Sequence, residues 1–424
     1  MTVTAFEGPA GTGKTHSLMG HLGTRMREQP LALHERVLAL TFMHGARRRL
    51  DSRLREIDGL GGRYHAATVD SFAWRLVQRW RRLAASLGYA IPPEEQYDKT
   101  CALAGALLTR PAVRSWVAVS FPLMLVDEAQ DLNAERSAMI EQAAASTHVA
   151  VAYDEFQCLN PALRPVPILG WLPGLCRPVS LVECRRTDDA ELLAAARAVR
   201  KGRPVKRDGR HFKVMLTPGR ANFAATWLAN FITWRGGGRV AVLTPSRRGG
   251  FADSIVDLVC TRSLGKQQNG PYRIAWESGD EGERRDLWQR LALPDRCSIA
   301  DAVAALEAHE GVHAVKAAKN WVTRQKRVLG VAEITAGEIR RQIDRSFATR
   351  RRFGASERGE FLAVTIQQAK NREFDHVVVI WPYTIPNDNE QKRRLLYNAI
   401  TRAQRSCLVL VQAQELLDAP PFVP

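Results

Sequence analysis

Cysteine is scarce and scattered in this sequence. Seven of the 424 residues are cysteines, and no two of them form a C-x-x-C pair. C-x-x-C pairs are typical of zinc clusters, and dense cysteine pairs are typical of small secreted domains. The sequence therefore argues against a metal cluster and a disulfide framework, and it favours a reducing compartment.

Long apolar runs and a leader segment are also missing. No apolar stretch approaches the roughly 20 residues that a membrane-spanning helix needs. The first residues, MTVTAFEGPAGTGKT, have neither the basic start nor the apolar stretch of a signal peptide. We therefore expect a soluble, cytoplasmic protein without a membrane partner.

Acidic residues are outnumbered by basic ones. The chain has 44 Asp and Glu against 61 Lys and Arg, which gives a formal net charge of +17. Such an excess favours association with a polyanion, and nucleic acid is the commonest polyanion. The alternative is a generic basic surface with no dedicated partner.

Nine short runs rich in apolar residues are separated by segments with helical periodicity. They are VTAFEG, RVLALTF, LMLVDE, HVAVAYD, PVSLVEC, RVAVLTP, FLAVTIQ, HVVVIWP and CLVLVQ. Continuous apolar runs are expected for strands that are buried on both faces, as in parallel sheets. Their alternation with helices predicts an α/β fold, and nine strands predict two parallel sheets.

Two segments interrupt this alternation, and both have helical patterns. They are residues 74–120 and residues 266–356, and the second half of the latter is strongly basic. Within it, Thr335 and Glu338 form a capping box that predicts the start of a helix. The following stretch, ATRRRFGASERGE, is predicted to be a linker that returns to the sheet. We interpret both segments as helical insertions.

The segment GPAGTGKT fits the phosphate-binding pattern G-x-x-x-x-G-K-[ST]. It follows a predicted strand and opens a predicted helix, which is the context that the pattern requires. Its backbone N–H groups would wrap phosphates, Lys14 would reach the β- and γ-phosphates, and Thr15 would ligate Mg²⁺. The predicted nucleotide-binding residues are Gly8, Pro9, Ala10, Gly11, Thr12, Gly13, Lys14, Thr15 and His16.

A second candidate element is LMLVDEAQDL, in which an apolar strand ends at Asp127 and Glu128. A carboxylate at a strand tip can hold Mg²⁺ through water beside the phosphates, and we assign this role to Asp127. Its neighbour Glu128 can polarise the attacking water. The alternative is a pair of acidic turn residues, but the presence of a phosphate loop in the same chain argues against it.

Eight segments, taken in order, resemble the motifs of superfamily 1A helicases, the UvrD/Rep/PcrA type. Two of them are the phosphate loop and the acidic segment. The others are LTFMHGARRRLDSRL, ATVDSFAWRL, VAYDEFQCL, LVECRRT, TIQQAKNREFDHVVVI and RRLLYNAITRAQ. A single motif of this kind is weak evidence, whereas eight in the family's order support the resemblance.

The resemblance implies a fold of two RecA-like P-loop parallel-sheet domains with two short, mainly helical insertions. Residues 1–174 would form domain 1A, with the insertion at about 74–120. Residues 175–265 and 357–424 would form domain 2A in two parts, and residues 266–356 would be a reduced, basic insertion of the 2B type.

In this family ATP lies between the two domains, and an arginine from the second reaches the γ-phosphate. The resemblance implies that Arg402 and Arg186 are such arginines, that Gln157 contacts the attacking water and the γ-phosphate, and that Glu373 binds the ribose. Asp154 is expected to order its loop. The predicted catalytic residues are Lys14, Asp127, Glu128, Gln157, Arg186 and Arg402. Arg185 replaces the family's adenine-stacking tyrosine, and a guanidinium can also stack on a base.

The resemblance also implies contacts with single-stranded DNA. The predicted DNA-binding residues are Thr41, Phe42, His44, Thr68, Phe72 and Gln367. Phe42 and Phe72 are candidates for stacking on bases. Aromatic residues next to strands often belong to the core instead, and this alternative stays open for both.

Together these features predict an ATP- and Mg²⁺-dependent DNA translocase or helicase, moving 3′ to 5′ by family analogy, that acts on single-stranded or tailed duplex DNA. The short insertions favour an alternative, in which the chain is a nucleotide-gated DNA sensor or an accessory subunit of a nuclease in phage defence, recombination or repair. A small-molecule P-loop kinase would leave the arginine-bearing sixth motif and the second sheet unexplained.

Overall fold

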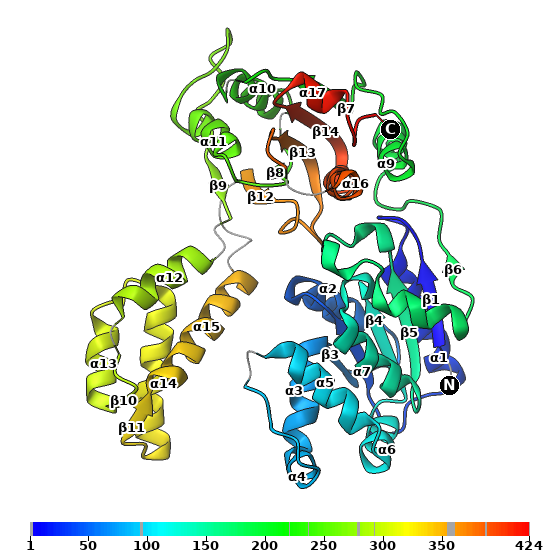
Figure 1. Cartoon of the computed structure of the whole chain (residues 1–424), viewed down its shortest axis with the longest axis vertical. Helices are drawn as coiled ribbons and strands as arrows, with labels where there is room; N and C mark the ends of the chain where they lie inside the picture. Colours follow the sequence, from blue (N-terminus) through cyan, green and yellow to red (C-terminus); the bar gives the residue numbers. More distant parts are fainter. Residues whose placement is uncertain are drawn as a thin grey trace. The chain divides into compact units, whose positions relative to one another are not determined.

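The computed structural model describes residues 3–93, 96–219, 221–235, 237–277, 280–291, 293–353, 361–385 and 388–423. The chain divides into two compact units. One comprises Met1–Tyr272 with Val364–Pro424, and the other comprises Arg273–Ala363. The larger unit contains the elements that form the candidate site (Figure 1).

The first sheet has six strands in the order β3-β2-β4-β5-β1-β6, and all its described pairings are parallel. Its strands are β1 (Val3–Glu7), β2 (Val37–Thr41), β3 (Tyr64–Thr68), β4 (Leu123–Asp127), β5 (His148–Tyr153) and β6 (Val179–Ser180). Every residue of β2 and β4 is buried, as expected for continuous apolar strands covered on both faces. Their carboxyl ends align, with Thr41 beside Asp127.

Helices and short 3₁₀ turns connect these strands. The helices are α1 (Lys14–Glu28), α2 (His44–Arg55), α3 (Val69–Arg79), α4 (Arg81–Ser86), α5 (Tyr97–Leu108), α6 (Pro111–Ser120), α7 (Ala134–Ala144) and α8 (Pro167–Trp171). The turns are η1 (Ala129–Asp131), η2 (Glu155–Gln157), η3 (Pro161–Leu163) and η4 (Leu172–Gly174).

The segment predicted as a helical insertion, residues 74–120, is helical in the structure. Its apolar side chains, such as Leu76 and Leu107, belong to the same buried core as Val126 and Val151 of the first sheet. The helices therefore cover the sheet rather than form a separate core.

The second sheet has the strand order β7-β14-β13-β8-β12-β9, and the pairings whose register is described are parallel. Its strands are β7 (Phe212–Leu216), β8 (Val240–Thr244), β9 (Ile274–Trp276), β12 (Phe361–Thr365), β13 (Phe374–Trp381) and β14 (Ala403–Val411). The accompanying helices are α9 (Ala190–Lys201), α10 (Ala221–Trp234), α11 (Phe251–Thr261), α16 (Asn389–Ile400) and α17 (Gln414–Leu417).

The predicted α/β class with two parallel sheets is therefore confirmed. Each of the nine predicted runs contains a strand. The sequence reading missed β3, β7 and β9 of the two large sheets, and also the short strands at Arg296–Ser298 and Glu333–Thr335. The edge strand β3 contains partly exposed residues and lacks the continuous apolar character of the central strands. The predicted domain boundaries remain predictions.

The smaller unit is mainly helical. It contains α12 (Asp280–Arg290), α13 (Ile299–Glu307), α14 (His313–Leu329) and α15 (Ala336–Phe353), with an antiparallel pair formed by β10 (Arg296–Ser298) and β11 (Glu333–Thr335). The predicted capping box is present, because the Thr335 N–H donates to Glu338 Oε2 at 2.9 Å and the Glu338 N–H donates to Thr335 Oγ1 at 3.2 Å.

The predicted linker ATRRRFGASERGE requires a correction. Helix α15 continues to Phe353, so the first part of that stretch is helical. The remainder, residues 354–360, lies outside the described residues. None of the helices in the described ranges is both long enough and apolar enough to cross a bilayer.

Candidate nucleotide-binding cleft

The phosphate loop connects β1 to α1 and depends on glycine at two positions. Gly11 and Gly13 have φ angles of 81° and 83°, in the left-handed region that favours glycine. A Cβ on Gly11 would also lie 2.8 Å from Cys184 Sγ and 2.9 Å from Arg186 Cβ. The loop is therefore tightly wound, and the segment that follows β6 packs closely against it.

Lys14 and Thr15 begin helix α1, where a phosphate would meet the N-terminus. Lys14 is buried, and its ammonium group donates to Gly8 O at 2.9 Å and Pro9 O at 3.0 Å. Burial lowers the pKa of Lys14, although neighbouring carboxylates oppose this effect. The Thr15 hydroxyl donates to Asp127 Oδ2 at 2.8 Å, so the structure brings the predicted metal-binding pair together.

Asp127 and Glu128 stand at the carboxyl end of β4. Burial, followed by the charge of Glu128, raises the pKa of Asp127 to about 6. Glu128 has a φ of 57°, an unusual conformation for a residue with a side chain, and its carboxylate accepts from Gln130 Nε2 at 2.5 Å. Burial opposes ionisation of Glu128, but nearby Lys370 and Lys14 lower its pKa overall, which keeps it available as a base.

Asp154 and Gln157 form a rigid turn after β5. Asp154 is fully buried, and its carboxylate accepts from the Phe156 N–H at 3.2 Å and from Gln157 Nε2 at 2.8 Å. The predicted role of Asp154 in ordering its loop is therefore confirmed. With its nitrogen held by Asp154, the Gln157 side chain directs its oxygen toward Arg402.

Arg402 follows helix α16 and is only 1% exposed. Its Nη2 donates to Gln157 Oε1 at 3.3 Å, and its Nε donates to Asn398 O at 3.1 Å. Burial and the nearby Arg186 lower the pKa of Arg402 to about 9. An arginine from near the C-terminus therefore reaches the turn that lies beside the phosphate loop.

A buried ion pair crosses the same cleft. Lys370 Nζ donates to Asp131 Oδ2 at 2.5 Å and Oδ1 at 2.6 Å, and to Gln157 O at 3.0 Å. Although burial opposes it, the charge of Asp131 raises the pKa of Lys370 overall. This pair ties the turn after β12 to the turn after β4.

The predicted second arginine and the predicted ribose-binding acid contact each other directly. Arg186 Nε donates to Glu373 Oε1 at 2.9 Å, and Arg186 Nη1 donates to Thr401 O at 2.8 Å. Glu373 Oε2 also accepts from Gln404 Nε2 at 3.1 Å. Arg186 is thus paired with a carboxylate, whereas the hydrogen bonds described for Arg402 go to neutral acceptors.

Arg185 and His16 both lie close to Gly13 of the phosphate loop. The Arg185 N–H donates to Gly11 O at 2.7 Å, and its Cδ lies 3.3 Å from the position of a Cβ on Gly13. Both side chains are exposed. The structure therefore holds Arg185 against the loop where a stacking group was predicted.

The predicted DNA contacts divide into two groups. Phe42 is 36% exposed, with the Arg136 guanidinium 5.5 Å from its ring centre, and Gln367 is also exposed. Phe72 is 3% exposed and packs edge-on against Phe121, which corrects the stacking prediction and supports the core alternative.

Two predicted DNA-contacting threonines are also inside the fold. Thr41 is 1% exposed. Thr68 caps helix α3 by accepting from the Ser71 N–H at 3.2 Å, which is a structural role that explains its position. The side chain of His44 lies outside the described residues.

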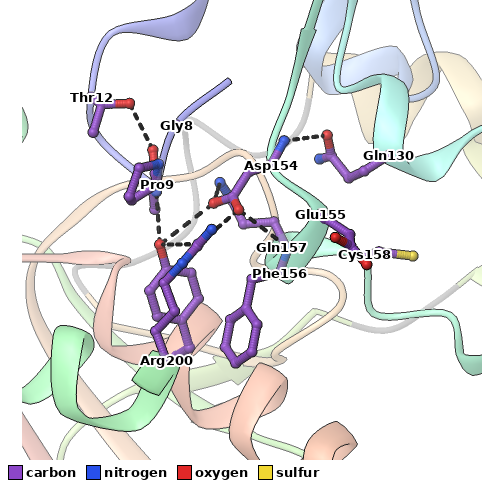
Figure 2. Close-up of polar contacts among 12 residues, drawn as sticks. Gly8, Pro9, Thr12, Gln130, Asp154, Glu155, Phe156, Gln157, Cys158 and Arg200 are labelled. Atoms are coloured by element: carbon purple, nitrogen blue, oxygen red, sulfur yellow. Dashed lines mark hydrogen bonds and ion pairs between the residues drawn. The ribbon is translucent and has the colours of Figure 1, made fainter. Parts of the chain in front are cut away.

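Arg200 is a cation of the cleft that sequence reasoning did not single out. Arg200 comes from α9, outside every motif-like segment, and its Nη1 donates to Asp154 Oδ1 at 2.7 Å (Figure 2). Its only signal in the sequence is its place beside the apolar stripe of α9, four residues after buried Ala196. A charged residue at that place is usually solvated, so the signal is weak.

A phosphate loop on one parallel sheet and a buried arginine presented by a second sheet define a fold of two RecA-like parts. Residues 360–410 of the chain match the model of the UvrD-like helicase C-terminal domain family. This match includes the fifth and sixth helicase-like segments, and it supports the predicted resemblance to superfamily 1 helicases.

Other comparisons are more distant. No curated protein gives a significant sequence match. Two solved structures of arterivirus nonstructural protein 10, a helicase, align with 98% of this chain at 12% identity, and one of them is a complex with DNA. Their TM-scores are 0.41 and 0.40, and this chain covers 62% and 61% of those chains, which is less than two thirds of their length.

Proposed function

We propose that this chain is an ATP-hydrolysing translocase that moves along single-stranded DNA, in the 3′ to 5′ direction, and separates duplex DNA ahead of it. The observation that carries the proposal is the buried Arg402, whose guanidinium meets Gln157 Oε1 at 3.3 Å across the cleft from the phosphate loop. None of the described ion pairs joins this buried guanidinium to a carboxylate, although Glu128 and Glu373 are near enough to act on its pKa. A γ-phosphate would supply a directly paired anion.

In the proposed reaction a water oxygen forms a bond to the γ-phosphorus while the bond to the β,γ-bridging oxygen breaks. Glu128 accepts the proton of the attacking water, since its pKa is held low and its carboxylate is oriented by Gln130. Lys14 and Arg402 stabilise the charge that spreads over the phosphoryl oxygens in the transition state.

Thr15 and Asp127 suit a magnesium ion. Their oxygens are hard donors and lie 2.8 Å apart, and burial, followed by the charge of Glu128, raises the pKa of the Asp127 carboxylate. When bound, the ion would neutralise phosphate charge, and Thr15 and Asp127 are the residues that would hold it.

Hydrolysis would be coupled to movement because the catalytic groups come from both sheets. ATP brings the arginine side and the phosphate-loop side together, and its conversion to ADP removes the charge that holds them. The exposed Phe42, on the turn that follows β2, is the proposed contact for a base of the strand. The net charge of +17 favours binding to the DNA backbone.

The deciding experiment measures ATP turnover with and without single-stranded DNA, for the wild type beside Glu128→Gln. We expect strong stimulation by DNA in the wild type, and loss of turnover with retained nucleotide binding in the variant. A variant that hydrolyses ATP as fast as the wild type would remove Glu128 as the base.

Duplexes with a single-stranded tail on one strand or the other test direction and unwinding. Strand separation that requires a 3′ tail supports the proposed polarity, because a 3′-to-5′ motor loads on that tail. Slow turnover that responds to DNA ends, without strand separation, would instead favour a nucleotide-gated sensor.

A further inference from the structure

Arg200 contacts two groups that belong to opposite sides of the cleft. Its Nη1 lies 2.7 Å from Asp154 Oδ1 and 3.3 Å from the Tyr397 hydroxyl. Its guanidinium also lies 5.3 Å from the ring centre of Phe156 and 5.4 Å from that of Tyr397. Figure 2 shows the side chain reaching into this cluster from below the phosphate loop.

Asp154 depends on this arginine. Its side chain is completely buried, and the ion pair with Arg200 supplies a cation to a carboxylate that has lost contact with water. A buried carboxylate is stabilised only when charges and hydrogen bonds compensate for its lost hydration. Asp154 accepts hydrogen bonds on both oxygens, and helix α9 supplies the cation that pairs with it.

The carboxylate of Asp154 in turn fixes the amide of Gln157. Gln157 Nε2 donates to Asp154 Oδ2 at 2.8 Å, so Gln157 Oε1 is free to accept from Arg402 Nη2 at 3.3 Å. A continuous chain of contacts thus runs from Arg200 through Asp154 and Gln157 to Arg402. It starts on α9 and ends just after α16, two helices that accompany the second sheet, and it passes through the turn after β5.

The same guanidinium also supports a contact with the phosphate loop. The Tyr397 hydroxyl accepts from the Ala10 N–H at 2.8 Å, and Arg200 lies on the other side of that hydroxyl. Arg200 therefore links the orientation of Gln157 to the position of the loop that would hold the phosphates.

We propose that Arg200 is a positioning residue that sets the Gln157 amide, so that hydrolysis proceeds only when α9 is seated against the turn after β5. This inference rests on the proposed ATP hydrolysis and adds a residue outside the helicase-like segments. Because Arg200 acts through Gln157 rather than on the nucleotide, its loss should affect turnover and leave nucleotide affinity nearly unchanged.

The test compares kcat and KM for ATP in Arg200→Gln, Arg200→Lys and the control Lys201→Gln, an exposed cation next to Arg200 on the same helix. We expect kcat to fall about tenfold in Arg200→Gln, with a KM change of less than about twofold, partial recovery in Arg200→Lys and no change in the control. Thermal melting of each variant verifies that it is folded.

A double-mutant cycle separates positioning from a general structural effect. In a Gln157→Ala background, Arg200→Gln should lower kcat by less than about twofold, since the group that it positions is already gone. An equal loss of kcat in both backgrounds would overturn the inference. If Arg200→Gln does not fold, the same cycle is run with Arg200→Lys, which keeps the charge but not the forked geometry.

The outcomes also distinguish this inference from the proposed function. A wild type without any ATP turnover would contradict the proposed function and the inference together. An active wild type whose kcat is unchanged by Arg200→Gln, or whose KM alone is changed, would contradict the inference and leave the proposed function standing.

Discussion

The two sides of the cleft differ in the charges that they present. Apart from Lys14 of the phosphate loop, the described groups at the carboxyl edge of the first sheet are mainly acids and an amide, while the elements of the second sheet contribute mainly cations. The first group is Asp127, Glu128, Asp131, Asp154 and Gln157, and the second is Arg200, Lys370, Arg394 and Arg402. Asp131 pairs with Lys370 across the cleft, and Asp154 pairs with Arg200, so each side supplies counter-charges to the other.

Two of the buried cations illustrate different uses of this arrangement. Lys370 is paired with Asp131 at 2.5 Å, and the pair raises the pKa of Lys370 despite burial. Arg402 is buried beside another arginine, Arg186, and donates to no carboxylate in the described contacts. Burial and the charge of Arg186 lower its pKa to about 9. Lys370 thus has a carboxylate in direct contact, whereas the described contacts of Arg402 include none, and this difference supports the role that we propose for Arg402.

The largest expected effect comes from breaking the ion pair between Lys370 and Asp131. Lys370→Met leaves Asp131 buried without its cation, which should lower the free energy of unfolding by about 3–5 kcal/mol. Urea unfolding followed by circular dichroism measures this loss through the shift in midpoint. The control is the double variant Lys370→Met with Asp131→Leu, which replaces the pair by apolar groups and should recover most of the stability. A single variant as stable as the wild type would mean that water already solvates this pair.

The next prediction separates an effect on ATP turnover from an effect on stability. Arg402→Met should reduce ATP turnover by about 10²–10³-fold, since it removes a donor to the developing phosphoryl charge. Its stability without nucleotide should be unchanged or higher, because a buried cation that lacks an anion is replaced by an apolar chain of similar length. Turnover assays and thermal melting on the same preparation test both parts. A large loss of stability would place Arg402 with Lys370, as a structural cation.

The sequence is sufficient to predict the parts of the site that depend on local chain geometry. The phosphate loop needs left-handed glycines between a strand and a helix, and that requirement is visible in GPAGTGKT. The acidic residues at the end of β4 can also be predicted from local sequence, because a continuous apolar run stops at Asp127. Both sheets could be predicted for the same reason, as buried parallel strands have continuous apolar sequences.

Partnerships between distant residues could not be predicted in this way. Nothing in the sequence near Arg200 indicates that it pairs with Asp154, 46 positions earlier, since α9 has ordinary amphipathic periodicity. The stacking prediction for Phe72 is wrong because a motif was present but the packing of the helix decided the position of the ring. Its motif suggested a surface contact, but the packing of α3 against Phe121 places the ring in the core. Such outcomes depend on how helices pack on a sheet, which single-sequence patterns do not specify.

The smallest effect concerns a neutral contact between the phosphate loop and helix α16 of the second sheet. Tyr397→Phe removes the hydroxyl that accepts from the Ala10 N–H at 2.8 Å, and it should cost about 1 kcal/mol of stability, the usual value for one hydrogen bond. Tyr383→Phe, at a position that is 62% exposed, is the matched control and should change nothing. Thermal melting without nucleotide measures both. A loss of stability well above that of one hydrogen bond would mean that the Tyr397 hydroxyl also holds Arg200 in place. No loss would mean that water replaces the hydroxyl at the Ala10 N–H, and that only the charged contacts hold the two sides together.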